Sequence, residues 1–135
     1  LQFSAINAAF IGEIMQRNIL FSAAIAGFLA VALGAFGAHG LKHSLSDYEL
    51  DIYKTAVNYH IWHALLLVLI AALPAHKLLN WAARLLIIGI MLFSGSLYLL
   101  AVIKVSWLGM ITPLGGVAFL LAWGLLAVVA YQHKA

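Results

Sequence analysis

Long apolar stretches alternate with short polar segments along this chain of 135 residues. A helix needs about 20 mostly apolar residues to cross a lipid bilayer. The pattern predicts four such spans, at residues 19–38, 55–73, 85–103 and 114–131. The second apolar run is short by itself, so its helix has to begin upstream and carry the residues before Ile61 into the membrane.

The ends of the spans have physical causes in the sequence. Pro74 has no N–H and disfavours helix at the residue before it, so the second span ends near Leu73. Lys104 ends the third span, where its amine can reach the headgroups, and Pro113 suits the first turn of the fourth. We therefore predict an all-α fold, an integral membrane protein built as an antiparallel four-transmembrane-helix bundle.

The second helix is predicted to start outside the bilayer. Ser46 followed by Glu49 forms a capping-box pattern, in which the serine caps an amide and the glutamate reaches back. Asp47 and Asp51 suit the positive end of the helix dipole. The second helix is thus expected to be extended into a surface amphipathic segment before it enters the membrane.

The first eighteen residues stand apart from this pattern. Residues 1–18 are interpreted as an N-terminal extension or an interfacial segment, and residues 19–135 as a single four-span transmembrane domain. Met15, followed by a short basic flank and an apolar helix, is typical of a natural start. A cleaved signal peptide is not expected, because the apolar stretch is longer than the usual hydrophobic region of such a peptide.

Composition supports a membrane location and narrows the chemistry. Hydrophobic residues make up 66% of the chain and charged residues only 8%, against about a quarter in soluble domains. The chain has no cysteine, which excludes disulfides, zinc–thiolate sites and iron–sulfur ligation. The net charge of +3 is scattered, so nucleic-acid binding is not expected.

The positive-inside rule gives a weak orientation. The side that holds both termini and the second loop carries four basic residues, and the opposite side carries three. We predict a bacterial cytoplasmic (inner) membrane protein with several spans and both termini in the cytoplasm.

Histidines are the most prominent polar residues near the predicted spans. On the second helix, Tyr53, His60 and His63 recur at spacings of three and four or their sums, which puts them on one face. His39 ends the first span and is expected on the same side of the membrane at a similar depth. We predict a polar cluster of these three histidines with two neighbours, which comprises His39, His60, His63, Asn58 and Tyr59.

Several interpretations of this cluster stay open. The structural one is interhelical hydrogen bonding that orders the bundle. The functional ones are a small-solute or proton transporter or channel that uses His39, His60 and His63, and a haem- or quinone-binding redox protein. A metal site on the same three histidines is a further alternative, although the chain has no strong metal-binding motif. No cofactor is predicted.

Small residues in the spans predict close helix packing. Lipid provides no hydrophobic force between helices, so close backbone approach has to supply the contact. The glycines expected to serve packing are Gly27, Gly34, Gly37, Gly89, Gly95, Gly115 and Gly116.

Four motifs in order, LGAFGAHGLK, NYHIWHALLL, LFSGSLYLL and ITPLGGVAFLLAW, resemble the small multipass membrane family of the YgdD/YwdK type, over residues 19–131. The resemblance implies a four-helix protein of the bacterial cytoplasmic membrane and carries no enzymatic activity. We expect a non-enzymatic accessory or interaction subunit of a larger, for example respiratory, membrane complex. Its expected partners are the lipid bilayer and other membrane subunits or further copies of itself.

Overall fold

Residues 1–133 are described by a computed structural model, and within them the secondary structure is helical, with no strands. Four of its helical segments are long and apolar enough to cross a membrane, which confirms the predicted fold class. The elements are α1 (Gln2–His39), α2 (Asp47–Ala72), α3 (Lys77–Gly89), a π-helix η1 (Ile90–Ser94), α4 (Gly95–Ile103), a 3-10 helix η2 (Ser106–Met110) and α5 (Thr112–Gln132).

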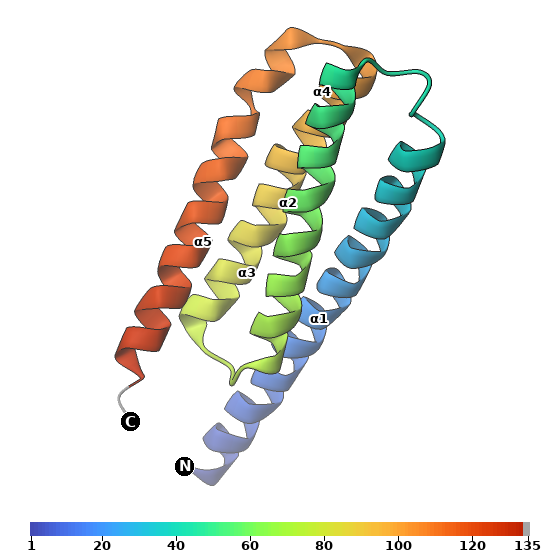
Figure 1. The fold of residues 1–135 in the computed structure, drawn as a ribbon. Helices are drawn as coiled ribbons and strands as arrows, with labels where there is room; N and C mark the ends of the chain where they lie inside the picture. The colour runs from blue at the N-terminus through green and yellow to red at the C-terminus, as the bar shows by residue number, and fades with distance from the viewer. Residues whose placement is uncertain (134–135) are drawn as a thin grey trace.

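The spans pack mainly on their neighbours in the chain (Figure 1). Helix α1 packs against α2, α2 packs against the α3–η1–α4 segment, and α5 packs against α3 and η1. Contacts between α1 and α3 are few. This order leaves one groove between α1 and the α3–η1–α4 segment and another between α2 and α5.

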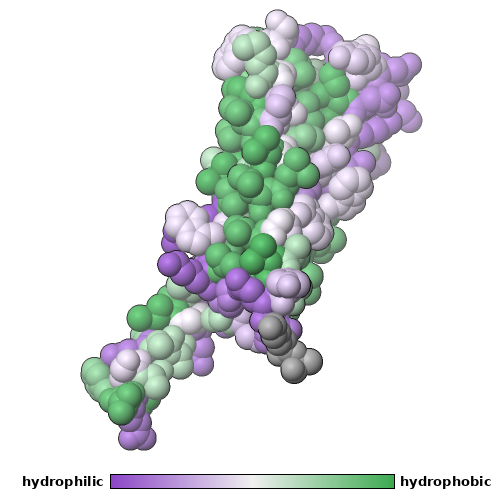
Figure 2. Space-filling view, turned by 90° about the vertical axis from the view of Figure 1, so that its left-hand side faces the viewer, coloured by the Kyte–Doolittle hydropathy of each residue, from purple (hydrophilic) through white to green (hydrophobic). Residues whose placement is uncertain are grey.

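On the side that Figure 2 shows, apolar residues cover much of the middle of the bundle, and polar residues gather toward its two ends. Half-exposed tryptophans lie near these ends, Trp81 at the start of α3 and Trp107 in η2. The guanidinium of Arg84 lies 4.8 Å from the centre of the Trp81 ring. Tryptophan and arginine in these places are typical of the two membrane–water interfaces.

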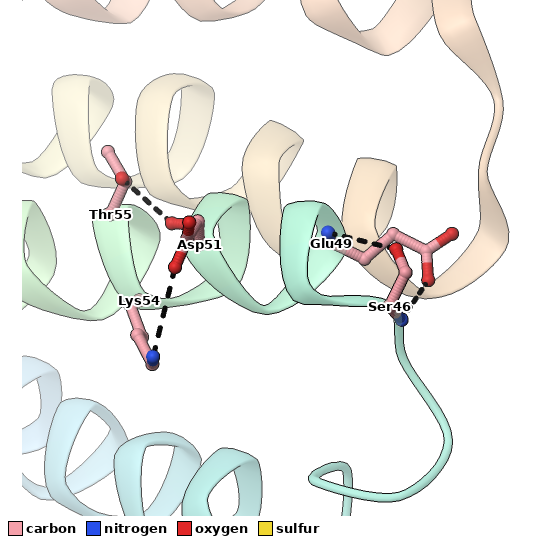
Figure 3. Close-up of polar contacts among 5 residues, drawn as sticks. All are labelled: Ser46, Glu49, Asp51, Lys54 and Thr55. Carbon is pink, nitrogen blue, oxygen red and sulfur yellow. Dashed lines mark hydrogen bonds and ion pairs between the residues drawn. The ribbon is translucent and has the colours of Figure 1, made fainter.

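Helix α2 begins as the sequence predicts (Figure 3). The backbone N–H of Ser46 donates to Glu49 Oε2 at 2.8 Å, and the Ser46 hydroxyl accepts from the Glu49 N–H at 3.3 Å. Further along α2, the Thr55 hydroxyl donates to the Asp51 carbonyl at 2.9 Å. We call this end of the molecule, with residues 40–46 and 104–111, the Ser46 end, and the opposite end, with residues 73–76, the Pro74 end.

Helix α1 runs without interruption through the segment that the sequence set apart. Its 38 residues give a length of about 57 Å, roughly twice the apolar thickness of a bilayer. The Gln16 side chain donates to the Leu73 carbonyl, which the end of α2 leaves without an intrahelical partner. A Cβ on Gly12 would lie 3.2 Å from Ala75. Gly12 and Gln16 therefore contact the Pro74 end, and the preceding turns of α1 extend beyond the bundle (Figure 1).

The third span contains a π-helical turn that the apolar pattern does not predict. Within it, the fully buried Ser94 donates its hydroxyl hydrogen to the Ala56 carbonyl of α2 at 2.8 Å. Gly115 of α5 lies directly against the Phe93 backbone. The π-turn is thus fixed on both sides, by a hydrogen bond to α2 and by close contact with α5.

The main core lies where α2, α3 and α5 meet. Its members are packed apolar side chains, and Leu67, Ile70 and Leu86 are the largest of the fully buried ones. A smaller apolar cluster, around Leu41, Tyr53 and Ala101, lies nearer the Ser46 end. Between these two clusters, α2 presents His60 and His63 to different neighbours.

Candidate functional site

The first groove, here called the α1–α4 groove, is a cavity of about 440 Å³. Its walls are almost entirely apolar, and large exposed side chains such as Phe21 and Met91 border it. The lining residues are Phe21, Ser22, Ile25, Ala26, Leu29, Leu33, His60, Ile87, Ile90, Met91, Gly95 and Tyr98. Ligand sites of this size are typically apolar with a few well-placed polar groups.

The polar group of this groove is a pair formed by His60 and Tyr98. His60 is only 4% exposed, and its Nδ1 lies 3.0 Å from the Tyr98 hydroxyl. Ala26 of α1 lines the groove together with this pair. The pair therefore joins α2 to α4 and gives the groove a hydrogen-bonding group.

The second groove, here called the α2–α5 groove, has a volume of about 660 Å³ and a largely aromatic lining. His63 lies in its wall, stacked on Phe119 with ring centroids 3.6 Å apart and an angle of 6°. The Trp123 Nε1–H donates to His63 Nε2 at 3.3 Å. His63 Nδ1 lies 2.7 Å from the Tyr59 carbonyl, to which it donates.

These contacts define the chemical state of His63. A carbonyl only accepts and an indole N–H only donates, so Nδ1 carries the hydrogen and Nε2 accepts. Both ring nitrogens of a neutral imidazole are thus used by the protein itself. The structural interpretation, interhelical hydrogen bonding that orders the bundle, describes this histidine well.

The structure does not gather His39, His60 and His63 into one cluster. Within residues 1–133, no group of three or more histidine, aspartate or glutamate side chains is placed to hold a metal ion. The cause is the register of α1 on α2, in which Gly37 lies against Tyr53 and Ala26 lines the α1–α4 groove with His60. His39 is exposed and thirteen residues, or about 20 Å, further along α1 than Ala26.

The other two members of the predicted cluster also lie apart. Asn58 is exposed and lines a small pocket between α1 and α2. Tyr59 faces the α2–α5 groove, where its ring centroid lies 4.4 Å from that of Phe93. The transporter, haem and metal interpretations placed these histidines in one site, whereas His60 lines the α1–α4 groove and His63 lines the α2–α5 groove.

The glycines differ in what surrounds them. A Cβ at Gly37 would meet the Tyr53 ring at 2.3 Å, and one at Gly89 would meet Phe119 at 2.5 Å. Gly34 and Gly115 are also close to a neighbouring helix. Gly27, Gly95 and Gly116 are not in tight contact, because a Cβ there would meet nothing nearer than 3.8 Å. Gly95 instead lines the α1–α4 groove.

An ion pair closes the Ser46 end between α2 and α4. The Lys104 ammonium lies 2.9 Å from Glu49 Oε1, and Lys104 ends α4 in the left-handed conformation, with φ of 59°. The hydrogen bond from Lys104, followed by that from the Ser46 N–H, holds the pKa of Glu49 below its ordinary value. Glu49 precedes the apolar span of α2, so this ion pair lies at the membrane surface.

The hydrogen-bond partners of the histidines, Tyr98 and Trp123, were not among the site residues expected from sequence. Each is a polar aromatic residue inside an apolar span. A polar group in such a span favours a partner on another helix, and that is the signal by which they could have been found.

Comparison with known proteins gives a consistent result. A family model described as "Protein of unknown function (DUF423)" matches residues 33–116. The UPF0382 membrane protein YwdK of Bacillus subtilis is 50% identical over 82% of this chain and 93% of its own length. The UPF0382 inner membrane protein YgdD of Escherichia coli is 39% identical over 88% of this chain and 93% of its own. A UPF0382 membrane protein of Staphylococcus epidermidis is 45% identical over 81% and 91%, respectively. No solved structure matches the chain.

Proposed function

The chain belongs to the UPF0382 (DUF423) family of membrane proteins, and from that premise we propose that it is a non-enzymatic protein that binds a lipophilic small molecule in the α1–α4 groove. The observation that carries the proposal is an apolar groove whose lining includes a hydrogen-bonded polar pair, the buried His60 and the half-buried Tyr98. An amphiphile dissolved in the membrane has an apolar body and a polar group, so it matches an apolar groove with a polar pair.

The π-helical turn supports this location. Ile90 and Met91 belong to η1 and line the groove. Single π-turns inside α-helices occur frequently at functional sites. Gly95, directly after the turn, keeps that part of the wall free of a side chain. The π-turn and Gly95 thus both lie in the wall of the α1–α4 groove.

The test is to fill the groove without disturbing the packing. Gly95→Leu places a side chain where the nearest atom to a Cβ is 4.0 Å away. We expect wild-type protein in a mild detergent to retain a lipophilic molecule, detected by native mass spectrometry, and Gly95→Leu to lose it. Gly124→Leu is the matched control, because Gly124 on α5 has open space around it and lies outside the groove. A wild-type protein without a bound molecule, or equal retention by Gly95→Leu, would refute the proposal.

A second candidate function is that of an accessory subunit in a larger membrane complex. The observation in its favour is the start of α1, which extends beyond the Pro74 end with exposed Phe3, Ile6 and Phe10 (Figure 1). Large apolar side chains outside the bundle favour contact with another apolar surface. The test is the mass of the native protein extracted in mild detergent. If it migrates at the mass of this chain alone, this candidate is excluded.

We also propose the bacterial cytoplasmic membrane as its location, with both termini in the cytoplasm. The Escherichia coli relative is named an inner membrane protein, and the excess of basic residues favours this orientation. The orientation is tested with reporters fused to the C-terminus. We expect activity from a reporter that works only in the cytoplasm, and activity from a reporter that works only in the periplasm would contradict the proposal.

A further inference from the structure

We infer that the ligand of the α1–α4 groove is a lipid with an anionic head group and a long alkyl chain, and that Arg84 binds the head group at the Pro74 end. This inference rests on the proposed function and names the chemical class of the ligand. It follows from a polar cavity that adjoins the groove, from the charges around that cavity and from the distance between two polar sites.

The polar cavity lies between α1 and α3 at the Pro74 end and has a volume of about 300 Å³. Its lining includes Asn18, Asn80 and Arg84. Ser22 of α1 and Ile87 of α3 line both this cavity and the α1–α4 groove, so the two spaces adjoin. Together they form one path along α1 and α3, polar beside Arg84 and largely apolar beyond Ile87.

The depth of the polar cavity suits a head group. Asn18 directly precedes the first predicted span and Arg84 the third, so both lie at the membrane surface. The centre of the half-exposed Trp81 ring lies 4.8 Å from the Arg84 guanidinium, and tryptophan is enriched at membrane–water interfaces. The apolar groove begins at the same level as these two spans. A chain that follows it therefore runs from the surface into the bilayer.

The charges at the Pro74 end favour an anion. Among residues 1–133, Arg17, Lys77 and Arg84 carry positive charges there, against the carboxylate of Glu13. In the same part of the chain the acidic partners of all ion pairs belong to the first turns of α2, so Arg84 is in no ion pair. A guanidinium binds a carboxylate or phosphate through two parallel hydrogen bonds, and basic pockets between transmembrane helices bind anionic lipid head groups.

Asn80 supplies a neutral donor in the same cavity. Its side-chain nitrogen donates to the Met15 sulfur, a weak acceptor, at 3.5 Å. A side-chain amide has two N–H hydrogens, so the second one is available to an oxygen of the head group. The contact with Met15 also joins α3 to α1 at this end of the path.

The separation of the two polar sites determines the length of the ligand. Along α3, η1 and α4, Arg84 and Tyr98 are separated by about 21 Å of helix. Half the apolar thickness of a bilayer is only about 15 Å. A ligand that reaches from Arg84 to the pair of His60 and Tyr98 thus has a chain that passes the bilayer centre. The far part of this chain contacts the pair, whose own hydrogen bond stays intact.

The experiment compares probes of one chain length, namely palmitate, hexadecyl phosphate and hexadecanol. Dissociation constants are measured for the full chain in a non-ionic detergent. Each probe is compared between wild type and variant, because the probes partition differently into micelles. We expect Arg84→Gln to weaken the anionic probes about tenfold and hexadecanol by about twofold or less. The anion with the higher wild-type affinity shows whether the natural head group is a carboxylate or a phosphate.

Lys77→Gln is the matched control, because Lys77 is exposed at the same end and lines neither the cavity nor the groove. We expect it to change each affinity by about twofold or less. Equal losses in Lys77→Gln and Arg84→Gln would show a general attraction of anions to this end and would overturn the inference. An equal loss of hexadecanol and the anions in Arg84→Gln would overturn it as well.

Gly95→Leu separates this inference from the proposed function, because it fills the groove and leaves the polar cavity unchanged. We expect it to weaken the binding of every probe. If Gly95→Leu weakens the probes and Arg84→Gln does not, the groove binds a ligand whose head group lies elsewhere, so only the inference fails. If no probe binds wild type more tightly than Gly95→Leu protein, the proposed function fails too.

Discussion

The two grooves on either side of α2 contain the same kind of residue and use it differently. His63 in the α2–α5 groove is stacked on Phe119, and both of its nitrogens are bonded within the protein. His60 in the α1–α4 groove is hydrogen-bonded to Tyr98, and both side chains line the groove. We interpret the bonds that His63 makes on both sides as packing, and we propose that the pair of His60 and Tyr98 contacts a ligand.

The largest expected effect on stability concerns helix packing, at the contact between Gly115 of α5 and the backbone of Phe93. Gly115→Ala places a Cβ 2.3 Å from the Phe93 backbone N. Because the clashing atom belongs to the backbone, a change of side-chain rotamer cannot relieve the clash. We expect a loss of about 3 kcal/mol in the free energy of unfolding, at the upper end of overpacking effects. The measurement is thermal or denaturant unfolding in detergent. Gly116→Ala is the control, because its Cβ would lie 3.8 Å from Phe93, and a similar loss there would show that the close contact is not the cause.

The next prediction compares the two polar sites directly. His63→Ala removes a stacked ring and leaves the Trp123 N–H without its acceptor, so we expect a loss of about 2 kcal/mol in unfolding free energy. Tyr98→Phe keeps the ring and removes one hydrogen bond, for which about 0.6 kcal/mol is typical in a membrane protein. The same unfolding assay measures both. If Tyr98→Phe is the more destabilising variant, the assignment of packing to His63 and binding to His60 is reversed.

The smallest expected effect concerns the Ser46 end. Since the pKa of Glu49 is lowered in the folded protein, the ionised carboxylate stabilises the fold at pH values above its ordinary pKa of 4.5. This contribution is lost as the pH falls through the lowered pKa. We expect the melting temperature of wild type to fall more between about pH 7 and about pH 3 than that of Glu49→Gln. Because the ion pair joins α2 to α4, the variant should also weaken retention of the lipophilic molecule in the α1–α4 groove. An identical pH profile for both proteins would show that the ion pair has no effect on stability.

Much of the fold could be predicted from the sequence because membrane insertion depends on local features. Length and apolarity define the four spans, and Pro74 and the Ser46–Glu49 box set the boundaries of α2. The candidate site could be predicted only in part. The spacing of His60 and His63 placed both on the inner side of α2, where both are buried. The spacing did not show that neighbours on α1 and α4 surround one of them and neighbours on α5 the other.

The sequence by itself determined that this chain is a four-span helical membrane protein, since hydropathy and helix boundaries act within each segment. The tertiary structure decided which polar residues meet. The register of α1 on α2 separates His39 from His60, because close contacts such as Gly37 on Tyr53 fix that register. The π-turn, held by Ser94 and Gly115, has no local hydropathy signal either. Both depend on side chains far apart in the sequence, and only packing brings these together.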